Sequence, residues 1–210
     1  MNRVKVRRPG LLILGLILSG LFLTGCPKKI PPPVVPTEKP PFVNPMDKLL
    51  QTFSPVESLQ AKASIRIDTV ERGEKNYFLL NGVVYYQKPD KLRILGFHPF
   101  GMALFDTLYR DGELFILIPL QKRAYAGEVS EFQDLIEKAG EIDITSTRNE
   151  SRNIPSRIRI VIVEKEIDIE LRLKDVSVDR ELPQDAFEWT LPNGVDIRPL
   201  ERLLRGKRGK

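Results

Sequence analysis

The sequence predicts a mainly β protein with some helix, of the α+β class, in which one antiparallel sheet of about ten strands curls on itself. Many short apolar runs follow one another, joined by turns, which is typical of such a sheet. Two amphipathic segments with helical spacing stand on either side of the first six runs. Two or three helices would cover a strongly curved sheet only partly, so an apolar gap is expected on its concave side. A fully packed interior is the alternative.

The first helix is expected to begin at Asn44 and Pro45. Asn44 suits the N-cap, Pro45 suits the first helical position, and Asp47 is favourable near the positive end of the helix. Ser54 and Pro55 end it. Its apolar stripe consists of Met46, Leu49, Leu50 and Phe53.

The strands begin after residue 60, where the period changes from 3.6 to 2. Residues 61–67 and 166–174 alternate between apolar and polar, which predicts strands with one wet face, whereas 77–86 is apolar on both faces. Turn residues such as Asp111 and Gly112 separate the runs. The expected strands are 61–67, 77–86, 92–97, 102–109, 114–118, 123–127, 142–144, 158–163, 166–174, 176–178 and 187–191.

A second helix is expected over 130–139. Ser130 and Gln133 form a capping box, and Gly140 provides the stop. A short last helix is expected over 200–204. The apolar stripe of the second helix consists of Phe132, Leu135, Ile136 and Ala139.

The first 25 residues have the three parts of a secretory signal peptide. Residues 2–8 carry four basic residues and no acid, 11–23 are mostly apolar, and small residues follow. As a helix the apolar run would be about 20 Å long, short of the ~30 Å hydrocarbon core of a bilayer. We therefore expect a signal peptide over 1–25 and not a membrane span.

The end of this segment, Leu23-Thr24-Gly25-Cys26, resembles the bacterial lipobox. The resemblance implies that the chain is cut before Cys26 and that this cysteine is acylated, which makes Cys26 the lipid anchor. An anchor of two or more acyl chains holds a protein stably on its membrane. An ordinary signal peptide with an incidental cysteine is the alternative.

A proline-rich linker is expected over 26–45. Eight prolines fall between Pro27 and Pro45, and proline favours extended polyproline II because it lacks an N–H and fixes φ. At ~3.1 Å per residue the linker could hold the folded domain up to about 55 Å from the membrane. A binding motif for a proline-recognition domain is the alternative. The domain itself is expected over 46–204 and a basic tail over 205–210.

Charge and cysteine content exclude several classes of function. The net charge is +5, but four positive charges lie in the signal segment, which leaves 5 − 4 = +1. Nucleic-acid binding is not expected, because the chain is exported and lacks interleaved aromatic and basic residues. The basic tail is either a solvated end or a contact for anionic lipid headgroups. One cysteine permits no internal disulfide.

No catalytic site is expected. The single histidine, His98, lies in an aromatic turn, where it suits loop hydrogen bonding. No metal-ligand spacing occurs in the sequence, and no cofactor is implied. Asp168 and Glu170 share the wet face of one strand with Arg172 and Lys174, a pattern typical of cross-strand ion pairs.

Three stretches together resemble the LolA/LolB lipoprotein-carrier superfamily of diderm bacteria, over roughly 59–200. The first is 59–67, which is similar to the opening strand of that family. The second is 92–95 followed by 99–101, which resembles the strand and Pro-Leu-Gly loop of LolB-like proteins, with Phe100 in place of leucine. The third is 182–197, which is similar to the closing turn and strand.

The resemblance implies an unclosed β half-barrel, partly lidded by helices, whose hydrophobic cavity receives the acyl chains of other lipoproteins. LolA-like members are soluble carriers, and LolB-like members are lipid-anchored receptors at the outer membrane. The lipobox points to the second role, on the periplasmic face of the outer membrane. The implied partners are the membrane, lipoprotein or lipid cargo, and a soluble periplasmic carrier protein. An anchored scaffold in envelope assembly is the alternative.

The resemblance also implies two sets of site residues. The exposed loop that helps to place cargo in the membrane falls on Phe97, Pro99, Phe100, Gly101 and Met102, with Phe100 at its tip. A loop folded back into the core is the alternative. The acyl-chain cavity is expected to be lined by Ile65, Ile67, Phe78, Leu80, Val84, Ile94, Leu104, Ile169 and Leu171.

Overall fold

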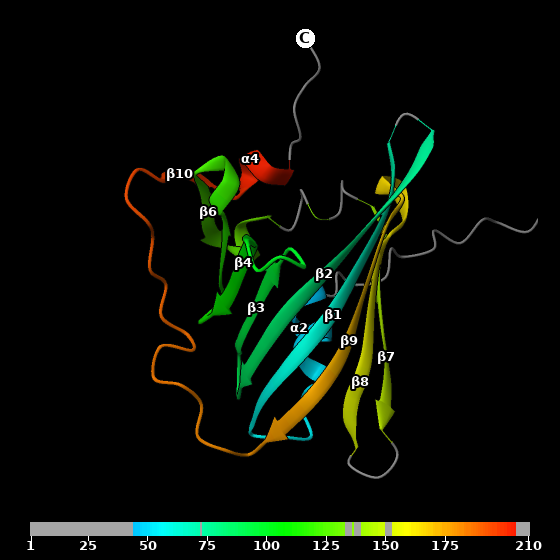
Figure 1. Ribbon diagram of the computed structural model, residues 1–210, viewed down its shortest axis with the longest axis vertical. Helices are drawn as coiled ribbons and strands as arrows, with labels where there is room; N and C mark the ends of the chain where they lie inside the picture. Colours follow the sequence, from blue (N-terminus) through cyan, green and yellow to red (C-terminus); the bar gives the residue numbers. More distant parts are fainter. Residues whose placement is uncertain (1–43, 72, 133–135, 137–139, 150–152, 205–210) are drawn as a thin grey trace, which may run out of the picture. The chain divides into compact units, whose positions relative to one another are not determined.

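The computed structural model describes residues 44–71, 73–132, 136, 140–149 and 153–204, all within one compact unit that begins at Phe42 (Figure 1). Ten strands form one sheet in the order β10-β6-β5-β4-β3-β2-β1-β9-β8-β7, and β10 and β7 are its two edges. The expected unclosed, mainly antiparallel half-barrel is confirmed. The strands are β1 (Ser58–Glu71), β2 (Glu74–Gln87), β3 (Lys91–Phe97), β4 (Ala103–Arg110), β5 (Glu113–Ile118), β6 (Arg123–Glu128), β7 (Ile142–Asn149), β8 (Ile154–Ile162), β9 (Ile167–Val178) and β10 (Asp196–Pro199).

The first two strands of the chain lie in the middle of the sheet, and later strands are added on both sides of them. Strands β1 to β6 form a meander in which each strand pairs antiparallel with the next. The chain then crosses to the opposite edge, and β7, β8 and β9 return to the free side of β1. Strand β10 is parallel to β6. Strands β1 and β2 are central, and each is 14 residues long.

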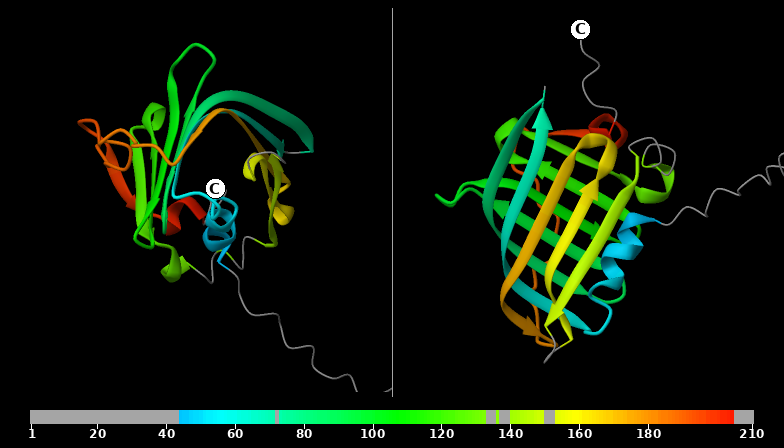
Figure 2. Two further views of the ribbon diagram at one scale, coloured as in Figure 1. Left: turned by 90° about the horizontal axis from the view of Figure 1, so that it is seen from below. Right: turned by 90° about the vertical axis from the view of Figure 1, so that its right-hand side faces the viewer.

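Helix α2 (Pro45–Gln51) lies on the concave side of the sheet, as the left view of Figure 2 shows. The expected cap is confirmed, because the Asn44 side chain accepts a hydrogen bond from the backbone N–H of Met46 at 3.0 Å. Leu49 and Leu50 are buried, and the Phe53 ring stacks on Tyr86 with 5.1 Å between ring centroids. The helix therefore closes the core over the beginning of β1 and the end of β2.

The other short helical elements occupy smaller parts of the fold. Helix α4 (Glu201–Leu204) follows β10, and Leu200 packs with Tyr125 in a small second core. Short 3₁₀ turns follow β5 (η2, Pro119–Gln121), β6 (η3, Val129–Phe132) and β8 (η4, Val163–Lys165). The expected helix over 130–139 begins in η3, and most of its remainder lies outside the described residues.

A non-helical segment, residues 180–195, crosses the convex side of the sheet, and we call it the strap. The expected strand over 187–191 is wrong, because this part of the strap makes no strand pairs. Arginine side chains of the sheet bind its carbonyl oxygens instead, and the ring of Trp189 packs on Phe115 at 5.2 Å. Leu108 of β4 and Ala186 of the strap are both buried.

The remaining differences concern strand limits. Residues 176–178 continue β9 and are not a separate strand, and the last strand is β10 over 196–199. The expected signal peptide over 1–25, Cys26, the expected linker up to residue 43 and the expected tail over 205–210 lie outside the described residues. Within the described part of the chain, no helix has the length and apolar character needed to cross a membrane.

Arg93 is the main link between the strap and the sheet. Its guanidinium holds Asp106 through two hydrogen bonds of 3.0 and 2.8 Å and donates to the carbonyl oxygens of Asp185 and Ala186. Both side chains of the ion pair are 14% exposed. The hydrogen bond to Asp106 raises the pKa of Arg93, so the guanidinium stays charged.

We predict that Arg93→Ala lowers the free energy of unfolding by about 3 kcal/mol, because it leaves Asp106 buried without its partner. The matched control is Arg66→Ala, which removes an exposed bidentate pair with Asp68 and should leave stability nearly unchanged. Urea unfolding of both variants measures the difference. Equal losses would show that Arg93 does not hold the strap.

Candidate functional site

An apolar pocket of about 290 Å³ lies between α2 and the concave face of the sheet. Thirteen residues from α2 and six strands line it, and none of them is charged. Apolar lining with few polar groups is typical of sites that take apolar ligands. The lining residues are Met46, Leu49, Ile65, Ile67, Leu92, Ile94, Phe105, Thr107, Tyr109, Leu114, Ile160, Ile169 and Leu171.

Burial along β1 and β2 decreases toward the hairpin that joins them. On β2, Val84 and Leu80 are buried, whereas Phe78 on the same face is exposed. On β1, Ile65 is buried and Ile67, which lies opposite Phe78 in the strand register, is half-buried. Ile65 and Ile67 both line the pocket, so its wall on β1 extends from a buried to a half-buried position.

Two glycines make room for lining side chains. A Cβ at Gly82 would lie 2.7 Å from Cδ1 of Ile65, and one at Gly96 would overlap the Phe105 ring. Ile65 and Phe105 thus lie across the backbone of a neighbouring strand. The pocket keeps its shape because β2 and β3 carry no side chain at these two positions.

Thr107 and Tyr109 are the polar lining residues, and both come from β4. Burial raises the pKa of Tyr109, so its hydroxyl stays neutral. The lining therefore offers hydroxyl groups and no formal charge. Such a site favours a hydrocarbon segment over an ionic ligand.

Five of the nine residues expected in the cavity line this pocket: Ile65, Ile67, Ile94, Ile169 and Leu171. The other four do not line it. Leu80 and Val84 are buried in the adjoining core, and Phe78 is exposed. Leu104 lies where the β3–β4 register shifts. Alternation with Ile94 could have found Leu92 on β3, whereas Phe105 and Tyr109 lie on β4, where residues of both faces are apolar.

The expected loop lies between β3 and β4 and projects from the sheet in both views of Figure 2. Phe100 is 91% exposed, Met102 is exposed, and Phe97 is half-buried. The loop is tied by hydrogen bonds: the His98 N–H donates to the Met102 carbonyl at 2.8 Å, and the Gly101 N–H donates to the His98 carbonyl at 2.7 Å. A short, hydrogen-bonded turn therefore presents the Phe100 ring to solvent.

The described contacts of His98 lie within the loop itself. Its Nδ1 accepts a hydrogen bond from the Phe100 N–H at 3.3 Å, and the two rings lie 5.0 Å apart. Pro99 and Gly101 are exposed, and Gly101 has a φ of +86°, where glycine is favoured. Among the described residues, no group of three or more His, Cys, Asp or Glu side chains is placed to hold a metal ion.

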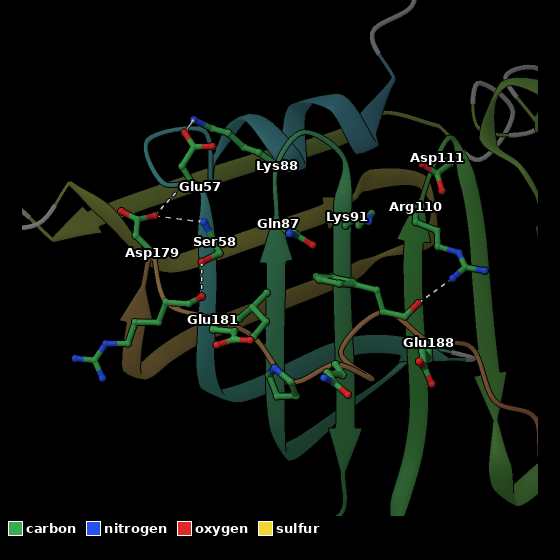
Figure 3. Close-up of a pocket in the computed structure, with 15 residues that line it drawn as sticks. Glu57, Ser58, Gln87, Lys88, Lys91, Arg110, Asp111, Asp179, Glu181 and Glu188 are labelled. Carbon is green, nitrogen blue, oxygen red and sulfur yellow. Dashed lines mark hydrogen bonds and ion pairs between the residues drawn. The ribbon is translucent and has the colours of Figure 1, made fainter.

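A larger polar cleft of about 750 Å³ lies at the other end of the sheet, between the strap and the ends of β1 to β4 (Figure 3). Its polar groups bind one another. Asp179 accepts from the backbone N–H groups of Glu57 and Ser58, and Lys88 pairs with Glu57 at 2.7 Å. Arg110 donates to the Phe187 carbonyl. These bonds fasten the strap, so the cleft is the weaker candidate.

No family model and no curated protein matches the sequence. Solved structures do match. A LolA superfamily protein from Nitrosomonas europaea is 12% identical, with a TM-score of 0.35 over 70% of this chain and 98% of that one. An uncharacterized conserved protein from Thermus thermophilus is 10% identical, with a TM-score of 0.44 over 72% of this chain and 97% of that one.

A DUF1329 family protein from Desulfovibrio piger is 9% identical, with a TM-score of 0.39 over 69% of this chain and 95% of that one. These likenesses concern the fold. They assign no ligand, partner or activity to this chain.

We predict that Phe100→Asp changes the free energy of unfolding by less than about 1 kcal/mol, because the ring contacts mainly the His98 ring and solvent. Phe53→Asp is the matched control, and it should unfold the protein because that ring is buried under α2. Thermal unfolding followed by circular dichroism measures both. A large loss in Phe100→Asp would place the ring in the core.

Proposed function

We propose that this protein is a lipid-anchored protein of the bacterial envelope that holds an acyl chain in the concave-face pocket and passes lipid or lipoprotein cargo to a membrane. The observation that carries the proposal is the pocket itself, which is lined by apolar side chains and two hydroxyl groups and carries no charge. A buried space of this kind costs free energy when empty, because its walls lose dispersion contacts. An acyl chain would supply those contacts.

The volume limits what the pocket takes. A methylene needs about as much space as a water molecule in the liquid, ~30 Å³. The 290 Å³ pocket thus takes roughly ten methylenes. This matches one acyl chain inserted part of the way, and it is too small for the two or more chains of a whole lipid. Such a cargo would keep its other chains outside the pocket.

The anchor and the role at the membrane extend the proposal. The segment Leu23-Thr24-Gly25-Cys26 and its resemblance to the lipobox support acylation of Cys26. The resemblance of the chain to LolB-like proteins, together with the exposed Phe100, supports a receptor that accepts cargo from a soluble periplasmic carrier. The proposed location is the periplasmic face of the outer membrane.

We predict that residues 27–210 bind one fatty acid per chain, with affinity rising up to a chain length near ten carbons and then levelling off. The physical reason is the fixed depth of the pocket, since each buried methylene contributes about 0.8 kcal/mol. Displacement of a fluorescent fatty acid by saturated acids of increasing length measures this. The fragment is suitable because every described core residue lies after Phe42.

Two neighbouring residues of β8 provide a matched pair of variants. Ile160 lines the pocket, whereas Val161 lies on the opposite face and pairs with Asp168. Ile160→Trp should weaken fatty-acid binding at least tenfold if it displaces about two methylenes. Val161→Trp should not. Equal affinities in both variants, or a wild type that binds no fatty acid, would favour an anchored scaffold with no lipid cargo.

We predict that the full chain, expressed in a diderm host, incorporates an alkyne analogue of palmitate and that Cys26→Ser does not. The serine variant should keep its first 25 residues and run as the larger precursor, because the cut depends on the modified cysteine. Gel fluorescence and intact mass measure both effects. Label retained in Cys26→Ser would remove the anchor from the proposal.

A further inference from the structure

The exposed apolar side chains gather at one end of the sheet. Turns between successive antiparallel strands alternate between the two ends of the sheet. The β1–β2, β3–β4, β5–β6 and β8–β9 turns therefore lie at the same end, which we call the hairpin end. Figure 1 shows the β1–β2 hairpin and the turn between β8 and β9 side by side there. The exposed large apolar residues among those described are Tyr77, Phe78, Leu79, Phe100, Met102, Leu120, Val163 and Ile197, and together they form the apolar rim.

Five residues of the apolar rim lie on or near a turn of the hairpin end, and Tyr77, Phe78 and Leu79 lie in the half of β2 that adjoins the β1–β2 turn. Leu120 lies in η2 and Val163 in η4, and Ile197 pairs with Ala124 two residues after the β5–β6 turn. The turns at the other end of the sheet carry polar residues, such as Lys88, Asp90 and Asp111. Turns at both ends of the sheet are exposed to solvent. Exposure alone therefore does not explain why the large exposed apolar residues gather at the hairpin end.

We infer that the apolar rim docks on a lipid bilayer. The β1–β2 hairpin gives the strongest argument. Tyr77, Phe78 and Leu79 are consecutive and 67, 53 and 54% exposed, and consecutive strand residues point to opposite faces. A protein groove would cover one face of this hairpin and leave the other in water, whereas lipid surrounds both faces. Tyrosine at such a tip also suits the membrane–water interface.

The pocket provides the second argument. Its wall includes Ile67, which lies opposite the exposed Phe78 of the rim. Ile67 in turn lies opposite Ile169, and Ile169 opposite Ile160, so an apolar row runs from the rim into the pocket. A rim seated on a bilayer would place this part of the pocket wall next to the acyl chains. The docking surface itself stands on its own exposed residues and does not need the pocket to be occupied.

The charges of the hairpin end are balanced in sign. The described turns carry Lys75, Lys122 and Lys165 against Glu74, Glu164 and Glu166. A basic patch would bind anionic lipid electrostatically and would release it in salt. The balanced rim binds through its apolar side chains. Binding should therefore occur on uncharged phosphatidylcholine vesicles and change little between low and high salt.

Two positions on β2 provide the test. Leu79 lies at the hairpin end and Gln87 at the other end, both exposed and on the same face of the strand. In residues 27–210, Leu79→Asp should lower the partition coefficient onto phosphatidylcholine vesicles about tenfold or more, the factor expected when a leucine no longer leaves water. Gln87→Asp adds the same charge and should leave it unchanged. Co-sedimentation with the vesicles measures both.

A second measurement reports contact directly. With Trp189 replaced by Phe, Leu79→Trp or Leu120→Trp should lose fluorescence on vesicles that carry brominated acyl chains, and Gln87→Trp should not. Fatty-acid binding in solution should stay at the wild-type value in Leu79→Asp, which separates this surface from the pocket.

Three outcomes would overturn the inference. The first is a wild-type fragment that does not bind the vesicles. The second is Leu79→Asp binding as tightly as Gln87→Asp. The third is a fragment that self-associates through the rim, seen as a dimer in sedimentation velocity that Leu79→Asp dissociates, with no vesicle binding.

Discussion

A helix of seven residues cannot cover a sheet whose central strands are fourteen residues long. Helix α2 is about 10 Å long at 1.5 Å per residue, whereas β1 spans about 46 Å at ~3.3 Å per residue. The sheet is a single layer, and among the described residues α2 spans only part of its concave face. The pocket lies between α2 and this face and takes lining residues from both.

The convex face of the sheet is exposed to solvent on one half and covered by the strap on the other. Over β1, β8 and β9 it meets water and carries ion pairs, such as Arg159 with Asp168 at 2.6 Å and Arg172 with Glu170 at 2.6 Å. Over β3 to β6 the strap covers it, and Arg93 binds the backbone of the strap. The strap thus does on the outside what α2 does on the inside, without forming a helix or a strand.

This division explains which residues could be predicted. On β1 and β9 one face is wet, so the alternation of apolar and polar residues identifies the inner face, which carries the lining residues Ile65, Ile67 and Leu171. On β4 both faces are covered, so Phe105 and Leu108 are both apolar although they face opposite sides. Periodicity cannot separate them there, and Leu104, which is expected in the cavity, packs against the core without lining the pocket.

The amino-acid sequence alone determined the mainly β class, the cap of α2, nearly all of the strands and the turn between β3 and β4, because these depend on local backbone preference and on alternation. It also carries the lipobox-like segment and the proline-rich stretch expected to be a linker, which lie outside the described structure. The tertiary structure decided the strap, the limits of the pocket and the gathering of apolar tips at one end. These depend on strand order and on long-range contacts such as Arg93 with Ala186, for which neighbouring residues in the sequence carry no signal.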